Sequence, residues 1–444
     1  MFIEKIRSVF QNKSVAIWGM GREGKSSFRL LKGLSVFGLA LYDDHITDEL
    51  KQLADGNARI LKHKTEMNDY DIILKSPGIV ALDSPEVIQT KLSSQTEIFL
   101  SIFRNQVIGI TGTKGKSTTT TLIYHILKSI HANTVLVGNI GIPCFDLLDV
   151  IDNETKIVFE LSCHQLQFAA QSPHIAILLN IYQDHLDHYK TLEKYIAAKE
   201  NIFRHQRNGD MLISSAENTA QNDCAAHLPQ KLIVFSENQN SDVSISGDIL
   251  TTPDGTVEIR NEDTKLIGKH NRSNIAVAYY VCHDLYGIDN AAFKKALLTY
   301  EGLPHRLQKI SVIDEVEYYD DSISTVPETA IAAIQSLGNV GTVIIGGMDR
   351  GINYHPLTDF LLSSNIDRII LLPDTSGRIH RQLRDKGCRI EIFCARDLAD
   401  AVCYCKQNTA RGKACLLSPA AASYGFYKNF EERGDHFKQL VTGE

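Results

Sequence analysis

Short apolar runs alternate with segments of helical periodicity along most of the chain. Each run is short enough for a buried strand and ends in glycine, proline or polar residues. Alternation of this kind predicts mostly parallel sheets covered by helices. We expect strands at 15–18, 37–42, 71–74, 107–110, 134–137, 157–161, 175–181, 343–345, 368–372, 389–393 and 414–417, a hairpin over 312–319, and helices over 26–32, 93–103, 117–130, 192–203 and 271–286.

This pattern divides into three blocks, at residues 1–96, 97–300 and 301–444. The last boundary falls at Gly302-Leu-Pro-His-Arg306, where glycine and proline end the preceding helical pattern. A chain of 444 residues has room for roughly two to four domains. We therefore predict an α/β protein of three domains, each with its own sheet.

Composition narrows the class of protein. Apolar residues make up 43% of the chain and charged residues 22%, the balance of a soluble globular protein. The net charge of -7 argues against a broad nucleic-acid surface but leaves room for a small basic pocket. Nine irregularly spaced cysteines indicate reduced thiols. No apolar signal core and no run of roughly 18 apolar residues is present, so we expect a cytoplasmic protein without membrane insertion.

A glycine-rich segment, Gly109-Ile-Thr-Gly112-Thr-Lys-Gly115-Lys116-Ser117-Thr118, joins a predicted strand to a predicted helix. This arrangement presents backbone N–H groups and the helix N-terminus to a phosphate. Lys116 can reach the β- and γ-phosphates, and Ser117 can offer its hydroxyl to Mg²⁺. Because the first glycine departs from the usual spacing, a helix start capped by Ser or Thr is the alternative. We interpret the segment as a phosphate-binding loop.

A second glycine turn, Gly19-Met-Gly21-Arg22-Glu23-Gly24, follows the first predicted strand, and Asp43 comes about twenty residues later. This spacing is typical of dinucleotide binding, with the acidic residue placed for a ribose or a base. The pattern alone is weak. It equally fits another nucleotide diphosphate or a plain strand–helix turn.

Acidic and histidine side chains follow two of the predicted buried strands. Asp184, His185 and Asp187 come after the strand at 175–181, and Glu160 ends the strand at 157–161. Ligands of open α/β sheets collect at such strand ends, where an acid can hold Mg²⁺. Helix capping by aspartate explains the first group equally well.

Two further segments cannot be assigned a function from their own residues alone. Lys199 lies on an amphipathic helical pattern and by itself indicates a surface lysine. Asn271 and Asn274 open the helix over 271–286, where they could cap the helix or hold an adenine or phosphate.

These segments occur together, and their combination resembles the Mur ligase family, which builds the peptide stem of peptidoglycan. The ending, Leu417-Ser-Pro-Ala-Ala-Ala-Ser423 with Lys428-Asn-Phe430-Glu-Glu-Arg-Gly434, is similar to the family members that add glutamate. The resemblance covers nearly the whole chain. Its other motifs, in order, are Gly112-Thr-Lys-Gly-Lys-Ser-Thr118, Gly138-Asn-Ile-Gly141, Glu160-Leu-Ser, Asp184-His-Leu-Asp187, Ala197-Ala-Lys199, His270-Asn-Arg-Ser-Asn274 and Gly302-Leu-Pro-His-Arg306.

The resemblance implies three domains: a Rossmann-like domain for a UDP-sugar, a central ATPase-type parallel sheet, and a Rossmann-like domain for glutamate. It implies a monomer that joins glutamate to UDP-N-acetylmuramoyl-L-alanine with ATP, through an acyl phosphate, in peptidoglycan precursor synthesis. The implied ATP-binding residues are Gly112, Thr113, Lys114, Gly115, Lys116, Ser117, Thr118, Asn271, Asn274, Arg306 and Asp321. The UDP-substrate residues are Gly21, Arg22, Glu23, Asp43, Gly78, Asn139 and His185, and the glutamate residues are Thr325, Arg350, Ser423 and Phe430.

The resemblance also implies a two-metal centre. Lys116, Lys199 and His185 are the implied catalytic residues, with CO₂ bound to Lys199 as a carbamate. Two Mg²⁺ ions are expected at Ser117, Thr118, Glu160, His185 and Lys199.

The third block departs from the pattern of these family members. Ile323, in Asp320-Asp321-Ser-Ile323-Ser-Thr325, stands where a lysine is common, and Arg350 replaces another lysine that helps bind glutamate. Arginine can grip a carboxylate through two hydrogen bonds, so binding is kept while its geometry changes. D-glutamate is therefore the default amino acid and L-glutamate the alternative. A folylpolyglutamate-type ligase and an NAD-dependent oxidoreductase are more remote alternatives.

Overall fold

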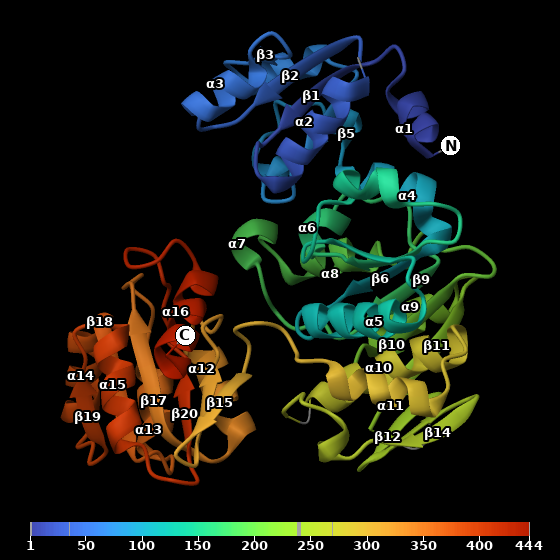
Figure 1. The fold of residues 1–444 in the computed structure, drawn as a ribbon. Helices are drawn as coiled ribbons and strands as arrows, with labels where there is room; N and C mark the ends of the chain where they lie inside the picture. Colours follow the sequence, from blue (N-terminus) through green and yellow to red (C-terminus); the bar gives the residue numbers. More distant parts are fainter. Residues whose placement is uncertain (1, 35, 238–240, 269, 444) are drawn as a thin grey trace. The chain divides into compact units, whose positions relative to one another are not determined.

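The computed structural model describes residues 2–34, 36–237, 241–268 and 270–443, with side chains except at 2, 3, 82, 186 and 187. Its described part forms two compact units, Met1–Thr264 with Arg272–Leu298, and Lys265–Asn271 with Thr299–Glu444. The described strands form two sheets in the first unit and one in the second (Figure 1). Helices within the described ranges are all too short or too polar to cross a membrane.

The first sheet places the glycine turn that follows its central strand. Strand order is β3-β2-β1-β4-β5, and all neighbours are parallel. Residues 15–18 of β1 are buried in the sheet. The glycine turn follows at the carboxyl end of this strand, and α2 begins at Arg22. The elements are α1 Phe2–Phe10, β1 Ser14–Trp18, α2 Arg22–Leu34, β2 Gly38–Tyr42, α3 Asp48–Ala54, β3 Arg59–Ile60, β4 Ile72–Lys75, β5 Leu92–Ser93 and α4 Gln95–Phe103.

The central sheet has the order β14-β13-β12-β11-β10-β9-β6-β8-β7. The neighbouring strands from β12 through β11, β10, β9, β6 and β8 to β7 are all parallel. Strands β13 and β14 extend the β12 edge in antiparallel pairing. Strand β6 is buried along its length between β8 and β9, and α5 packs on β6, β7 and β8. The strands are β6 Val107–Thr111, β7 Thr134–Gly138, β8 Lys156–Glu160, β9 Ile175–Leu178, β10 Met211–Ser215, β11 Lys231–Ser236, β12 Val243–Ser246, β13 Ile249–Thr252 and β14 Gly255–Glu258.

The helices that accompany this sheet are α5 Lys116–Ile130, α6 Cys163–Leu166, α7 Leu186–Tyr189, α8 Leu192–Glu200, α9 Thr219–Ala226, α10 His270–Tyr280 and α11 Asn290–Thr299. Helix α10 continues as a π-helical turn, Val281–Leu285. The short helices α6 and α7 both contact α8, which brings three segments distant in sequence together.

The sheet of the second unit has the order β15-β16-β20-β17-β18-β19, antiparallel only between β15 and β16. Separate apolar clusters cover its two faces, one including α12 and α13 and the other α15 and α16. The elements are β15 Gln308–Ile313, β16 Val316–Asp320, α12 Pro327–Leu337, β17 Val340–Gly347, α13 His355–Leu362, β18 Arg368–Asp374, α14 Ser376–Asp385, β19 Glu391–Cys394, α15 Leu398–Asn408, β20 Ala414–Leu417 and α16 Phe430–Thr442.

The structure confirms the α/β class and the predicted parallel sheets. The sequence pattern did not single out β10 to β14. The last three of these strands lie at the sheet edge and mix buried with exposed positions, so they lack the apolar runs of the central strands. The helix predicted over 192–203 ends at Glu200, and the one predicted over 271–286 finishes in the π-helical turn.

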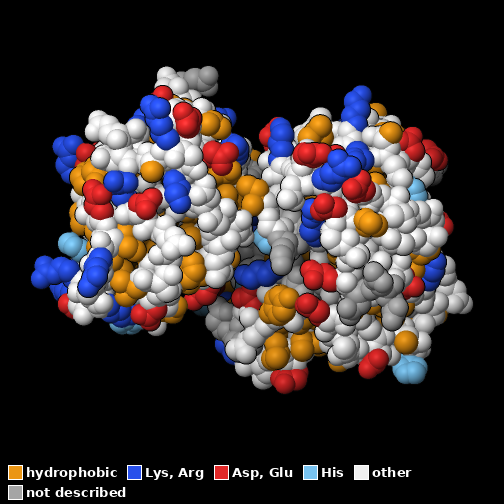
Figure 2. Space-filling model, turned by 90° about the horizontal axis from the view of Figure 1, so that it is seen from below, with side chains coloured by type: hydrophobic (Ala, Val, Ile, Leu, Met, Phe, Trp, Pro, Cys, Tyr) orange, Lys and Arg blue, Asp and Glu red, His pale blue; other side chains and the backbone are white. Residues whose placement is uncertain are grey.

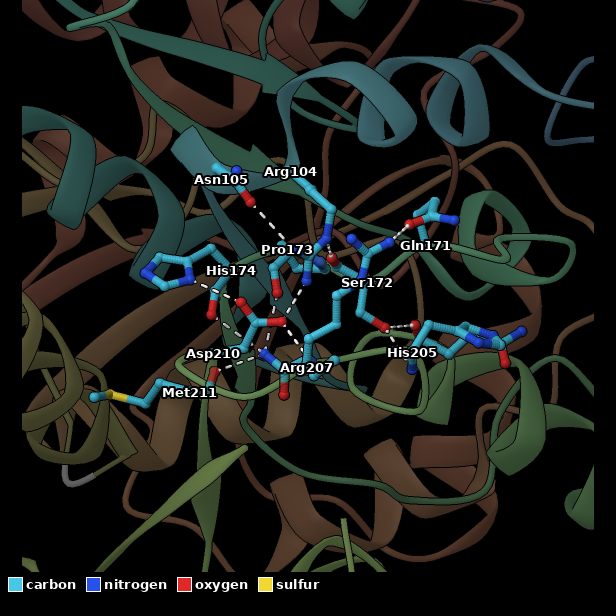
Figure 3. Close-up of polar contacts among 12 residues, drawn as sticks. Arg104, Asn105, Gln171, Ser172, Pro173, His174, His205, Arg207, Asp210 and Met211 are labelled. Carbon is cyan, nitrogen blue, oxygen red and sulfur yellow. Dashed lines mark hydrogen bonds and ion pairs between the residues drawn. The ribbon is translucent and has the colours of Figure 1, made fainter. Parts of the chain in front are cut away.

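A buried ionic network fixes the amino-terminal edge of the central sheet. Figure 3 shows Arg104 and His174 both pointing toward the carboxylate of Asp210. Asp210 pairs with Arg104, and its Oδ1 lies 2.8 Å from Nδ1 of His174. These residues precede β6, β10 and β9, at the sheet edge opposite the phosphate loop. We therefore assign this network a role in stabilising the central sheet, away from the phosphate loop.

The surface shows no segregation of charge on the face drawn in Figure 2. Acidic and basic side chains are intermingled there among neutral residues.

Candidate active site

The phosphate loop lies where β6 gives way to α5. Gly112 has φ 156° and Gly115 has φ 83°, backbone conformations that favour glycine. A Cβ at Gly115 would also lie 2.8 Å from Oδ1 of Asn274, so a side chain there would collide with a residue of α10. Asn180 holds the loop from β9, because its Oδ1 accepts a 2.8 Å hydrogen bond from the Lys114 N–H. The loop is thus shaped by glycine and by contacts from two neighbouring segments.

Two lysines converge on this loop. Nζ of Lys116 and Nζ of Lys199 each donate a 2.8 Å hydrogen bond to the carbonyl oxygen of Gly112. Lys199 is only 1% exposed. Burial lowers the pKa of Lys116, and burial together with the nearby Lys116 charge lowers the pKa of Lys199 to about 7. Lys199 is therefore a buried lysine at the phosphate loop, which corrects the interpretation as a surface lysine that its helical pattern alone favours.

Glu160 ends β8 beside the loop and is completely buried. Its Oε1 accepts a 2.6 Å hydrogen bond from Nδ2 of Asn139, whereas Oε2 has no hydrogen-bond partner among the described residues. A buried carboxylate oxygen without a partner costs free energy unless a cation or water completes it. Ser117 and Thr118 lie at the start of α5. This donor set of carboxylate and hydroxyl oxygens fits Mg²⁺.

His185 lies in the segment between β9 and α8, with φ 52° and a side chain 45% exposed. Its ring is 4.9 Å from the ring of His164 and 6.1 Å from that of Tyr195. Tyr195 in turn lies 2.9 Å from Oγ1 of Thr113, which connects this segment to the phosphate loop. Sequence reasoning missed His164 and Tyr195. Burial lowers the pKa of His164 to about 3, so its ring is neutral.

A cavity of about 470 Å³ opens beside the glycine turn of the first sheet. It is lined by Gly19, Met20, Gly21, Arg22, Glu23, Asp43, Ser76, Pro77, Gly78, Ile79, Gly138, Asn139 and Pro143. The structure thus brings together six of the residues expected at the UDP group, from four separate segments; His185 is not among the lining residues.

Polar groups in this cavity are held in fixed positions. Asp43 Oδ2 accepts a 2.7 Å hydrogen bond from the N–H of Met20, which ties the acidic residue to the glycine turn. Glu23 Oε1 accepts a 2.6 Å hydrogen bond from Gln165, while its buried Oε2 has no partner among the described residues. Burial raises the pKa of Glu23. The free Oε2 of Glu23 can therefore form a hydrogen bond with a ligand.

Lys75 is a supporting residue that sequence reasoning missed. Its buried Nζ donates hydrogen bonds to the carbonyl oxygens of Ser76, Pro77 and Ile79, the loop that closes one side of the cavity. Burial lowers the pKa of Lys75 to about 8. A lysine at the buried end of β4, directly before Ser-Pro-Gly, is the sequence signal that could have indicated it.

In the second unit, the segment after β16 carries several predicted residues. Asp321 is buried and accepts hydrogen bonds from the Leu307 N–H at 3.1 Å and from Ser418 at 2.7 Å. Burial raises the pKa of Asp321 to about 6. Nδ2 of Asn271 donates a 2.7 Å hydrogen bond to the carbonyl oxygen of Ile267, and Arg306 is exposed. Asp321 thus shapes the loop from which Arg306 projects.

Of the residues expected to bind glutamate, Thr325, Arg350 and Ser423 lie on loops after strands β16, β17 and β20, and Phe430 begins α16. Ser423 is buried, Thr325 and Phe430 are half-buried, and Arg350 is exposed. Sequence reasoning missed Arg433, whose buried guanidinium donates to the side chain and carbonyl oxygen of Ser322 and to the carbonyl oxygen of Ala421. Burial lowers the pKa of Arg433 to about 10. Arg433 therefore joins the loop after β16 to the loop after β20.

Comparison with known proteins agrees with this geometry. Residues 110–282 match the Mur ligase middle domain. The chain is 35% identical to the UDP-N-acetylmuramoylalanine--D-glutamate ligase of Symbiobacterium thermophilum over 84% of each chain. It is 34% identical to the enzyme of the same name from Clostridioides difficile, over 97% of this chain and 99% of that one.

Solved structures show the same fold at low identity. UDP-N-acetylmuramate-alanine ligase from Thermotoga maritima matches with a TM-score of 0.60 at 19% identity, over 97% of this chain and 99% of that one. MurF from Acinetobacter baumannii matches with a TM-score of 0.63 at 16% identity, over 92% and 91%.

The phosphate loop, its two lysines and the parallel sheet that carries them define an ATP-using enzyme. The chain belongs to the Mur ligase family. Within that family it is similar, over nearly its full length, to relatives named D-glutamate ligases.

Proposed function

We propose that the chain joins D-glutamate to UDP-N-acetylmuramoyl-L-alanine at the expense of ATP, in peptidoglycan precursor synthesis. The observation that carries the proposal is the convergence of Lys116 and Lys199 on the Gly112 carbonyl, beside the open carboxylate oxygen of Glu160. The names of the relatives supply the substrates. The cavity at the first sheet is large enough for a nucleotide group.

The reaction needs activation, because a free carboxylate is a poor acyl donor. The alanine carboxylate attacks the γ-phosphorus, the bond to ADP breaks, and an acyl phosphate forms. The glutamate amine then attacks the acyl carbon, a tetrahedral intermediate collapses, and phosphate leaves. The loop N–H groups and Lys116 hold the phosphate chain and stabilise the charge that develops on the transferred group.

We propose that Ser117, Thr118 and Glu160 hold one Mg²⁺ ion, and that His185 and Lys199 hold a second. These cations would supply charge neutralisation at the phosphates. Lys199 fits this role only after it has bound CO₂, since the carbamate carries the negative charge that the ammonium lacks. Its lowered pKa and its closeness to Lys116 support the modification, because a carbamate would replace repulsion between two cations with attraction.

We propose that the second unit binds the incoming glutamate through Thr325, Arg350, Ser423 and Phe430. Arg350 and Ile323 favour a second candidate, the same reaction with L-glutamate. The resemblance places lysines at both positions, so Ile323 removes a cation and Arg350 moves the point from which a cation meets the glutamate carboxylates.

The test is phosphate release and product mass with purified chain, ATP, Mg²⁺ and UDP-N-acetylmuramoyl-L-alanine, with D- and L-glutamate in parallel. Turnover with D-glutamate alone supports the main proposal, and turnover with L-glutamate alone supports the second candidate. No product with either enantiomer would refute both. Lys116→Met serves as the inactive control.

A further inference from the structure

Two metal-ligating side chains outside the set proposed for Mg²⁺, Cys163 and His164, meet one member of that set, His185. One ligand atom each from Cys163, His164 and His185 lies within 4.8 Å of the other two. Cys163 and His164 begin α6 directly after β8, and His185 follows β9. Because β8 and β9 flank β6 on either side, the sheet order brings these segments together.

The ligand chemistry of this group differs from that of Mg²⁺. Thiolate and imidazole select Zn²⁺ and related transition metals, whereas Mg²⁺ prefers oxygen ligands. Zinc bonds of about 2.0–2.3 Å hold ligand atoms within roughly 4 Å of one another. Small side-chain rotations would therefore close the observed spacing around a cation.

The surroundings already orient the rings and leave an entrance. The ring of His164 stacks on Tyr189 at 5.5 Å, and its Nδ1 lies 3.4 Å from the Tyr189 hydroxyl. Contacts of this kind fix the orientation of ligating histidines. Cys163 is buried, but the side chain of His185 is 45% exposed, so a cation can enter from the His185 side.

We propose that Cys163, His164 and His185 bind one thiophilic divalent cation of the Zn²⁺ class, with water as the fourth ligand. Because this inference also rests on the proposed function, it has a consequence for catalysis. A cation held by Cys163 and His164 withdraws His185 from Mg²⁺. Zn²⁺ is then an inhibitor that excess Mg²⁺ relieves poorly.

The test measures Zn²⁺ binding to the full chain by competition with a chromophoric chelator, in excess Mg²⁺ and without ATP or UDP substrate. The wild-type chain should bind one Zn²⁺ tightly. Cys163→Ser and His164→Phe should each weaken binding by about 10-fold or more. The matched control is the double variant Cys394→Ser/His380→Phe, which removes an exposed cysteine–histidine pair 3.9 Å apart and should bind as the wild type does.

Co²⁺ provides a second readout, an absorption spectrum that reports thiolate ligation directly rather than through an affinity. The wild-type Co²⁺ complex should show thiolate-to-metal charge-transfer absorption, and Cys163→Ser should lose it. Unchanged Zn²⁺ affinity in Cys163→Ser, loss of binding in the control instead, or a wild-type Co²⁺ complex without thiolate absorption would each overturn the proposal. Since no substrate is present, an absence of ligase activity would refute the proposed function and leave this result standing.

Discussion

Lys116 and Lys199 share one hydrogen-bond acceptor, the carbonyl oxygen of Gly112, which lies 2.8 Å from each Nζ. Burial imposes a desolvation cost on a charged amine at Lys199, and the nearby Lys116 ammonium adds repulsion. The pKa of Lys199 falls from 10.5 to about 7, so near neutral pH much of its amine is uncharged. Burial and repulsion thus favour the neutral amine that the proposed carbamate at Lys199 requires.

The first prediction concerns this reaction. Only the neutral amine attacks CO₂, so labelling of Lys199 with ¹³C-bicarbonate should increase as pH rises through about 7. A carbamate ¹³C resonance should appear in the wild type and vanish in Lys199→Ala, whose phosphate release should drop by about 10²-fold. Lys194→Ala, an exposed position on the same helix, should keep both. A resonance that persists in Lys199→Ala would contradict the assignment.

The lowered pKa of Lys199 also makes the free energy of unfolding depend on pH. Between about pH 7 and 10.5 the unfolded chain binds a proton at this site that the unmodified folded chain does not. The contribution of Lys199 to folding free energy therefore improves as pH rises across this window. Below about pH 7 the buried ammonium penalises folding in full.

The second prediction tests the open oxygen of Glu160. Asn139→Ala removes the amide that orients this carboxylate, so the apparent Mg²⁺ affinity in the ligase assay should fall by about 10–100-fold. Activity at saturating Mg²⁺ should recover in part. Asn133→Ala, directly before the same strand β7, is the matched control and should leave the Mg²⁺ dependence unchanged. Equal Mg²⁺ dependence in the two variants would argue against a metal at Glu160.

Local signals in the sequence predicted the phosphate loop and the α/β class. Glycine spacing, an apolar strand and a following helix all lie within about twenty residues of one another, so no long-range information was needed. The position of the glycine turn beside Asp43 was predictable for the same reason, since both follow adjacent parallel strands.

The roles of the other site residues depend on contacts between segments far apart in the sequence, which the local pattern does not encode. Lys199 lies 87 positions from its acceptor Gly112, and only the packing of α8 shows that it is buried. The meeting of Cys163 with His185 requires the order β9-β6-β8, which the strand pattern leaves undetermined. Lys75 and Arg433 likewise acquire their roles from loops that fold around them.

The third prediction concerns glutamate binding. Arg350→Ala removes a guanidinium that can hold a carboxylate through charged hydrogen bonds worth about 1.5–3 kcal/mol. The KM for glutamate should therefore rise by about 10–100-fold, with little change in the KM for ATP. Arg381→Ala, at an exposed position on α14, controls for general loss of positive charge. A KM for glutamate that is equal in both variants would exclude Arg350 from glutamate binding.

The fourth prediction separates stability from catalysis at the opposite edge of the central sheet. Asp210 is 4% exposed and neutralises the buried Arg104, so Asp210→Asn leaves a buried guanidinium without its counter-charge. Breaking a buried pair in this way should cost about 3–5 kcal/mol in the free energy of unfolding of the first unit, measured by urea denaturation. KM values should stay unchanged where the variant is folded, because the network lies away from the phosphate loop. Glu258→Gln, which breaks an exposed pair with Arg260, should leave the urea midpoint where it is. An Asp210→Asn variant as stable as Glu258→Gln would show that the network adds nothing to the sheet.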